Sequence, residues 1–265
     1  MKTIILSFDD SRRDFYTNVF PLLKEFNIPA TLNVITDFVH HPQDYSFPSG
    51  NDEAMTMDQL KECAASGLVE LACHGHTHKN TKEDVLDNIQ IINDLLDRRN
   101  MVGFASPTSA ITWDNKNEHG VWDLVEEGRL SYIRSGIRIR REGYIYTLVS
   151  MIDSKVHSNS LFWLLNKRTI NPIELQMPLL NSTTIHSYTK TGQIKNFIKK
   201  AREDSAIILM FHSVKKRLEN GYGADKFYFD YDDFRDIIQF LKATANIEVK
   251  KTIDFVDKNL KWQRI

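Results

Sequence analysis

The chain has 265 residues, of which 42 % are hydrophobic and 26 % charged, and its formal net charge is −1. This is the composition of a globular protein with a sizeable core. The balanced charge argues against nucleic acid as a main partner, and no apolar run approaches the roughly 18 residues of a membrane-spanning helix. The basic runs at 134–141 and 198–202 are interpreted as solvated faces.

The cysteines and the first residues indicate a compartment. Two cysteines, Cys63 and Cys73, are too few for a disulfide framework and fit a reducing environment. The opening segment, MKTIILSF, is too short for a secretory signal and is followed at once by acids. We therefore expect a cytoplasmic protein, provided that no leader has been removed.

Strands and helices alternate along the first part of the chain. Hydrophobic runs predict strands at 3–8, 30–36, 69–73 and 101–105. Helical periodicity predicts a helix over 15–26, which Pro21 kinks or restarts. The capping-box spacing at 56–59 opens a second helix that stops near Gly67, and TKED at 81–84 opens a third.

The second part repeats this rhythm less clearly. Helices are predicted near 120–127, 190–203, 231–242 and 252–258, and strands near 131–134, 144–149, 206–211 and 247–249. The stretch from about 150 to 190 is the least readable part of the sequence and is insertion-like. Alternating strands and helices imply parallel βαβ units, and about seven of them favour a (β/α) barrel, complete or incomplete, over an open sheet. We expect one domain over 1–265.

Polar residues end three of these strands. Asp9 and Asp10 follow the first strand, His74, His76 and His78 follow the third, and His212 follows the strand at 206–211. Functional residues of parallel barrels gather at the C-terminal ends of the strands, so these side chains are expected to converge on one face.

A carboxylate with two imidazoles is a ligand set for zinc that leaves a position open for water, as in catalytic sites. On a continuing strand, His74, His76 and His78 would share one face; at helical spacing, His74 and His78 pair and His76 points away. Gly75 makes a regular strand unfavourable and favours the second arrangement. The alternative is that the three histidines belong to a polar loop that binds no metal. His119, His157 and His186 are interpreted as structural.

The residues also resemble a known family. The segment LSFDDSRRDFYTNVFPLLKEFNIPATLNVIT is similar to the opening of the polysaccharide deacetylase family, the NodB-homology domain of carbohydrate esterase family four. That family typically shows T-F-D-D-G, then H-[ST]-x-x-H, then an L-x-L-H strand. This chain has SFDD, HGHTH and LMFH in the same order, and the resemblance extends from residue 3 to about 258.

The resemblance implies a distorted, incomplete (β/α) barrel that hydrolyses the N-acetyl group of an amino sugar. It implies one divalent metal ion, Zn²⁺ before Co²⁺, Ni²⁺ or Mn²⁺, held by Asp10, His74 and His78. By the same resemblance Asp9 is the catalytic base, His212 is the general acid, and the main-chain amide of Thr108 is a candidate oxyanion donor.

Two features depart from the family's motifs. Its third motif often has an arginine two places before the proline, where this chain has Ala105, although FASP resembles the F-A-Y-P of branches that act on surface poly-N-acetylglucosamine. The glycine after F-D-D is Ser11. Asp153 is a candidate orienting partner for His212, the alternative being a solvated acid.

These features predict a metal-dependent deacetylase that acts on an N-acetylated sugar of a surface polysaccharide or of its cytoplasmic precursor. The missing arginine motivates an alternative, a catalytically silent glycan-binding member. A hydrolase or deformylase of another small amide is a further alternative.

Overall fold

The computed structural model describes residues 1–46, 53–136, 144–216 and 226–262. The strands are β1 (Lys2–Phe8), β2 (Ala30–Val34), β3 (Val69–Cys73), β4 (Val102–Ala105), β5 (Leu130–Gly136), β6 (Asn171–Pro172), β7 (Leu179–Thr184), β8 (Ser205–Phe211), β9 (Ser213–Lys215), β10 (Tyr228–Asp230) and β11 (Ile247–Lys250). The helices are α1 (Phe20–Phe26), α2 (Thr36–His40), α3 (Met57–Ala65), α4 (Lys82–Leu95), α5 (Val121–Glu126), α6 (Tyr144–Val156), α7 (Asn159–Asn166), α8 (Thr191–Lys200), α9 (Tyr231–Ala243) and α10 (Thr252–Asn259). Short helical turns are η1 (Phe15–Val19), η2 (Pro42–Asp44), η3 (Pro107–Ser109) and η4 (Lys167–Thr169).

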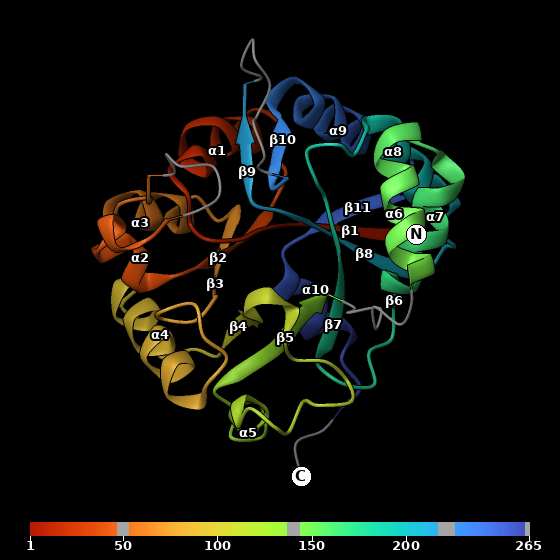
Figure 1. Ribbon diagram of the computed structural model, residues 1–265. Helices are drawn as coiled ribbons and strands as arrows, with labels where there is room; N and C mark the ends of the chain where they lie inside the picture. Colours follow the sequence, from red (N-terminus) through yellow and green to blue (C-terminus); the bar gives the residue numbers. More distant parts are fainter. Residues whose placement is uncertain (47–52, 137–143, 217–225, 263–265) are drawn as a thin grey trace.

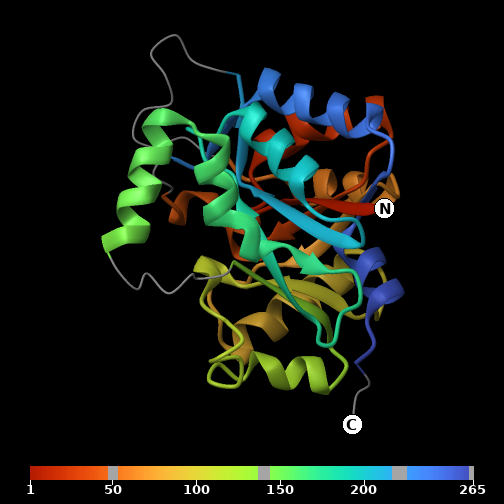
Figure 2. The same ribbon diagram turned by 90° about the vertical axis from the view of Figure 1, so that its right-hand side faces the viewer.

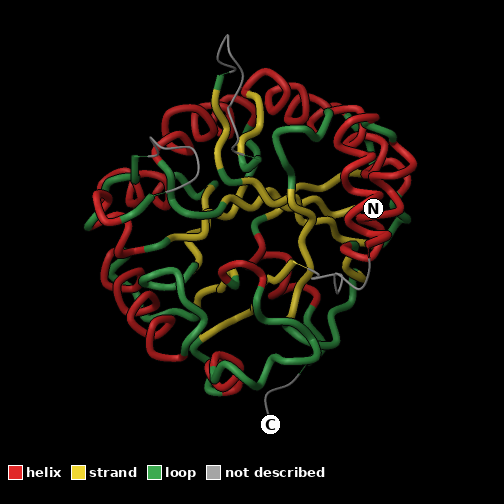
Figure 3. The backbone as a smooth tube through the Cα atoms, in the orientation of Figure 1, coloured by secondary structure: helices red, strands yellow, loops and turns green. Residues whose placement is uncertain are grey.

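Seven parallel strands close into a barrel in the order β1-β2-β3-β4-β5-β7-β8, because β8 pairs back with β1. Helices surround the strands (Figures 1 and 3). Only Ser7 and Phe8 of β1 pair with β2, whereas Lys2 to Ile5 pair with β11. The predicted (β/α) barrel is thus confirmed: it is closed, and β11 distorts it by entering between β1 and β2.

Alternation along the barrel strands separates the main core, beneath the helices, from the barrel interior. In β1, Ile4, Leu6 and Phe8 pack in the main hydrophobic cluster beneath the helices, whereas Ile5 belongs to a separate, smaller cluster. Successive side chains of a strand point to opposite faces, so Ser7 and the following Asp9 share the barrel-facing row of Ile5. The first strand therefore carries Asp9 into the barrel.

Local signals in the first half act as predicted. Pro21 lies in the first turn of α1 and follows the π-helical turn η1, so it restarts the helix rather than kinking it. Thr56 and Gln59 form a reciprocal capping box at the start of α3. Thr81 caps α4, since its side chain accepts a hydrogen bond from the backbone of Asp84.

One assignment in the second half was wrong, because the predicted strand at 144–149 is the first part of helix α6. The less readable, insertion-like stretch 150–190 contains the barrel strand β7. The apolar run at 144–149 fits either structure, because a short run does not separate a strand from a helix by periodicity. Strand β7 contains Asn181, Ser182, Thr183 and Thr184, so its sequence lacks the apolar character of the other barrel strands.

None of the helices in the described ranges is long and apolar enough to cross a membrane.

Candidate active site

A cleft of about 1120 Å³ opens at the C-terminal ends of the barrel strands. Its lining includes all of the residues that the sequence singled out as site candidates: Asp9, Asp10, His74, His78, Thr108, Asp153 and His212. They come from the ends of β1, β3, β4 and β8 and from helix α6. The topology thus brings together residues that lie up to two hundred positions apart in the sequence.

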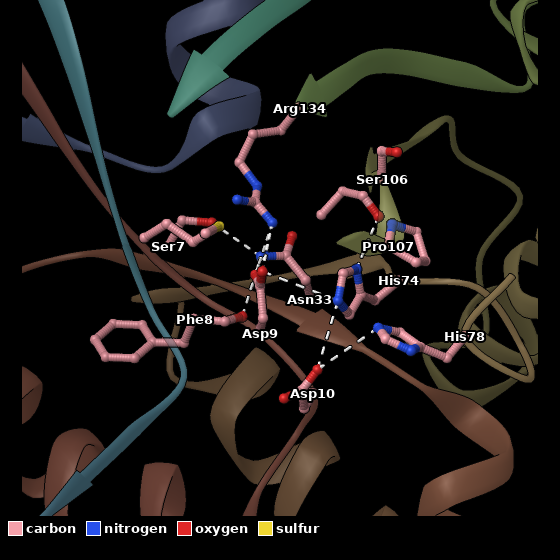
Figure 4. A network of polar contacts seen from close by, with 12 residues as sticks. Ser7, Phe8, Asp9, Asp10, Asn33, His74, His78, Ser106, Pro107 and Arg134 are labelled. Atoms are coloured by element: carbon pink, nitrogen blue, oxygen red, sulfur yellow. Dashed lines mark hydrogen bonds and ion pairs between the residues drawn. The ribbon is translucent and has the colours of Figure 1, made fainter. Parts of the chain in front are cut away.

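The adjacent acids Asp9 and Asp10 point to different partners (Figure 4). Asp9 continues the inward row of β1, whereas Asp10 has a left-handed backbone with φ of 78°. This turn releases Asp10 from strand alternation and directs its carboxylate to His74 and His78. Two neighbouring acids can therefore contact different parts of one site.

Asp9 is held by Arg134 and Asn33. Both carboxylate oxygens of Asp9 accept hydrogen bonds of 2.7 Å from one terminal nitrogen of Arg134, and Oδ1 also accepts one of 2.8 Å from Nδ2 of Asn33. Burial by itself would raise the pKa of Asp9, but Arg134, His74 and His212 together lower it below the usual value. Asp9 is therefore an oriented carboxylate at neutral pH.

Arg134 corrects two interpretations of the sequence. It is only 1 % exposed, so the first residue of the basic run 134–141 is not part of a solvated face; residues 137–141 of that run lie outside the described residues. Arg134 on β5 is also the register partner of Ala105 on β4. Arg134 therefore lies on the strand next to the position at which the family often has an arginine, and it contacts Asp9.

Asp10 is held by a second buried arginine. Nε and a terminal nitrogen of Arg12 donate hydrogen bonds of 3.0 and 2.8 Å to Oδ2 of Asp10. Arg12 is 2 % exposed and also donates to Oγ of Ser213 at 3.2 Å. Although burial opposes ionisation, the neighbouring His74 and Arg12 hold the pKa of Asp10 well below its usual value. Oδ1 of Asp10 is left to face the histidines.

His74, His78 and Asp10 form a cluster whose ligand atoms all lie within 4.8 Å of one another. Nε2 of His74 is 3.5 Å from Oδ1 of Asp10, and Nε2 of His78 is 4.0 Å from the same oxygen. Ligand atoms about 2.1 Å from a tetrahedral zinc ion lie roughly 3.4 Å apart. Nδ1 of His74 donates to the carbonyl oxygen of Ala105 at 2.8 Å, which leaves the lone pair of Nε2 for a metal. The cluster fits a divalent cation.

His76 points away from this cluster. Its Nδ1 lies 2.9 Å from Oγ1 of Thr36 at the start of α2. The loop that separates the histidines is held by Asp84, whose carboxylate accepts hydrogen bonds from the backbone nitrogens of Thr77 and Lys79. Gly75 has φ of +79°, and a Cβ there would lie 2.7 Å from Asp84 Oδ2 and from a backbone oxygen. Glycine at this position lets the turn form.

His212 faces the cleft from the end of β8. Its ring packs on Phe227 with 4.5 Å between ring centroids. Among the described residues, Nδ1 of His212 has no hydrogen-bond partner. Burial lowers the pKa of His212 more strongly than Asp10 and Asp9 raise it, so the neutral imidazole is favoured.

Asp153 does not pair with His212 in the part of the chain that the structure describes. Its carboxylate instead accepts hydrogen bonds of 3.0 and 3.2 Å from Nε2 of Gln193. It is not a solvated acid either, because it is 4 % exposed. Thr108 lines the cleft in η3 with φ of 54°, a left-handed conformation that any non-glycine residue adopts at a cost.

The sequence reasoning missed the arginines and one histidine. The available signal for Arg134 was its position inside the predicted strand. In LSYIRSG it follows Tyr132 by two residues and therefore shares its strand face. His186, interpreted as structural, lines the cleft and stacks on Tyr188 with 5.0 Å between centroids. Burial lowers the pKa of His186 to about 4, so it faces the cleft as a neutral ring.

Comparison with known proteins agrees with this geometry. Residues 1–120 match the family model described as polysaccharide deacetylase. Over 78 residues the chain is 38 % identical to the poly-beta-1,6-N-acetyl-D-glucosamine N-deacetylase of Escherichia coli K12. The matched stretch covers 28 % of this chain and 12 % of that protein. Over 100 residues it is 31 % identical to the enzyme of the same name from Staphylococcus aureus MSSA476, covering 36 % and 33 % of the two chains.

The chain therefore spans at most about a third of the length of these two relatives. For the whole barrel, the fold resembles a family 4 acetyl xylan esterase from Clostridium thermocellum, solved with a cobalt ion. That match has a TM-score of 0.52 and 15 % identity, and covers 97 % of this chain and 91 % of the other. At this identity the likeness concerns the fold alone.

Proposed function

Because the chain belongs to the polysaccharide deacetylase family, we propose that it is a metal-dependent hydrolase that removes the N-acetyl group from an amino sugar. The proposed substrate is a surface polysaccharide or its precursor. The observation that carries this proposal is the Asp10, His74 and His78 cluster beside the ionised Asp9, all at the wall of one cleft. A glycan-binding protein has no need of a metal-ligand set next to an oriented carboxylate.

The proposed metal ligands are Nε2 of His74, Nε2 of His78 and Oδ1 of Asp10. A divalent cation there, with zinc as the first choice, would polarise the amide carbonyl and lower the pKa of a water molecule. Arg12 fixes the carboxylate of Asp10, and the carbonyl of Ala105 fixes the tautomer of His74. Such outer contacts orient the ligands before binding.

The remaining steps fall to the chain's own residues. Oδ2 of Asp9 lies 3.9 Å from Nε2 of His74, and Asp9 is proposed to take the proton of the attacking water. The main-chain amide of Thr108 is proposed to donate a hydrogen bond to the oxyanion. His212, whose neutral form is favoured in the free protein, is proposed to take up a proton first and then to donate it to the departing amine.

Acetate release from N-acetylglucosamine oligosaccharides tests the function. The protein should release acetate after Zn²⁺ or Co²⁺ is added. A chelator should abolish this activity, and adding the same metal back should restore it. Formate release from N-formyl oligosaccharides, measured in parallel, separates a deacetylase from a deformylase. Glycan binding without release of either acid would favour the catalytically silent alternative.

The motive for that silent alternative was the absence of an arginine at position 105. The carboxylate of Asp9 is nevertheless held by Arg134. The departure in the third motif therefore does not leave the proposed base without a partner.

The two histidines of the loop should behave differently in metal binding. His78→Ala removes a ligand and should abolish stoichiometric Zn²⁺ binding and turnover together. His76→Ala, a matched change two residues away, removes only a contact to Thr36 and should retain the metal. Elemental analysis of both purified variants measures this, and equal metal loss in the two would overturn the ligand assignment.

Zinc binding should weaken as the pH falls below the pKa of His74. Burial alone would lower this pKa, but Asp9 and Asp10 outweigh it and raise the pKa above its usual value. Because protonated histidine cannot bind metal, the affinity should be constant above this pKa and fall about tenfold per pH unit below it. Burial lowers the pKa of His78 to about 4, so His78 stays neutral over this range.

Competition titrations with a chromogenic chelator at several pH values measure the effect. Asp9→Asn serves as the control, since removing that negative charge should move the decline to lower pH. A zinc affinity that does not change between about pH 5.5 and pH 8 would contradict the assignment of His74 as a ligand.

A further inference from the structure

Helix α6 has its apolar face on the outside. Leu148, Met151, Ile152 and Val156 are 57 %, 56 %, 42 % and 65 % exposed. These positions fall on one side of a helix. The opposite side carries Ser150 and Asp153, which line the cleft. A surface helix normally has the reverse arrangement, and clustered exposed apolar side chains mark an interaction surface.

The neighbouring helix α7 adds Leu164, which is 53 % exposed. Helices α6 and α7 lie side by side at the outer edge of the molecule, with α6 projecting furthest (Figure 2). We call the five exposed apolar residues of these helices the outer apolar face.

The charge around the outer apolar face is positive. Lys155, Lys167 and Arg168 are exposed, and Asp153, which is buried, is the one acid in the sequence from 144 to 169. The whole chain has a net charge of −1, so this segment departs from the average.

The exposed apolar side chains and the positive charge together decide between two possible partners of the outer apolar face. A second copy of the chain, paired through the same face, would bring identical cations together, which disfavours association. An anionic lipid surface accepts both features, because apolar side chains enter the acyl boundary while lysine and arginine reach the headgroups. Helix α6, with 13 residues, is about 20 Å long, which suits a helix lying in the interface rather than crossing it.

We propose that the outer apolar face of α6 and α7 docks the protein on an anionic membrane surface. The cleft then opens on the other side of the same two helices, since Phe162 and Asn166 of α7 also line it. Docking does not depend on the proposed function, and its test measures binding alone.

Co-sedimentation with lipid vesicles tests the proposal. The full chain should bind vesicles of phosphatidylcholine with phosphatidylglycerol more tightly than phosphatidylcholine alone, and salt should weaken this binding. The triple variant Leu148→Gln, Met151→Gln, Ile152→Gln keeps good helix formers and should lower the partition coefficient at least about tenfold. The matched control is Met101→Ser, a 39 % exposed methionine directly before β4 at the opposite end of the barrel, and it should bind as the unmodified chain does.

A second variant keeps the proposal testable if the first fails to fold. Lys155→Glu, Lys167→Glu, Arg168→Glu should remove the preference for phosphatidylglycerol. The proposal is overturned if the unmodified chain binds neither vesicle, or if the glutamine variant binds as tightly as the unmodified chain. It is also overturned if analytical ultracentrifugation finds a dimer that the glutamine variant abolishes while vesicle binding persists.

Discussion

Replacing Asp9 by asparagine should lower kcat at least about a hundredfold, which is the lower range for a general base, while zinc affinity at neutral pH stays within a few fold. The amide has nearly the shape of the carboxylate, so Asn33 and Arg134 still find an oxygen to contact. It cannot accept the proton of an attacking water. Asp9 also lies outside the Asp10, His74 and His78 cluster, so the metal site keeps its ligands.

The measurement pairs acetate-release kinetics with elemental analysis of the same sample. Asp10→Asn is the matched control: it is the same chemical change one residue away, but it removes a proposed ligand and should lose metal as well as turnover. Near-full activity in Asp9→Asn would show that another group serves as the base. Loss of zinc in Asp9→Asn would instead mean that both acids bind the metal.

Replacing Arg134 by glutamine should destabilise the metal-free protein by about 3–5 kcal/mol, the range for breaking a buried ion pair. The variant leaves the Asp9 carboxylate buried, with Asn33 as its remaining hydrogen-bond partner among the contacts described. Without the guanidinium the pKa of Asp9 should rise, because burial would then be opposed only by the histidines. The acid limb of the kcat profile should therefore move to higher pH.

Urea unfolding and a pH–rate profile of Arg134→Gln measure these two effects. The double variant with Asp9→Asn provides the control, since it removes the unpaired charge and should regain part of the lost stability. Arg134→Lys keeps a positive charge at this position and should restore part of the pKa shift relative to Arg134→Gln. An unchanged pH profile in Arg134→Gln would mean that Arg134 supports the barrel but does not position the base.

Much of the fold followed from periodicity, and the errors have physical causes. Strand β8 was predictable because SAIILMF is buried throughout its length. Strand β7 was not, because LLNSTT has two apolar residues followed by four polar ones and therefore forms no hydrophobic run. The first part of helix α6 was taken for a strand because YIYTLV, residues 144–149, is a short run rich in aromatic and β-branched residues that fits either structure.

The candidate site, like the fold, was only partly predictable from the sequence. Asp9, Asp10, His74, His78 and His212 all follow strands, so a parallel topology alone predicts that they meet. Their supporting partners could not be predicted in this way. Contacts such as that from β5 to β1, between Arg134 and Asp9, depend on strand order and register, which hydrophobic patterns do not specify.

The residues with left-handed backbone conformations around the cleft affect how this protein can gain thermal stability. Asp10, Ser11, His78, Thr108 and Ser109 all have φ between 52° and 78°, and each such residue costs on the order of 1 kcal/mol. Their combined cost is comparable to the net stability of an ordinary domain, about 5–15 kcal/mol. The closed barrel must therefore supply enough additional stabilising free energy to hold these turns in place. Selection for heat resistance alone would favour relaxing them, so thermal tolerance and turnover are expected to oppose each other in this scaffold.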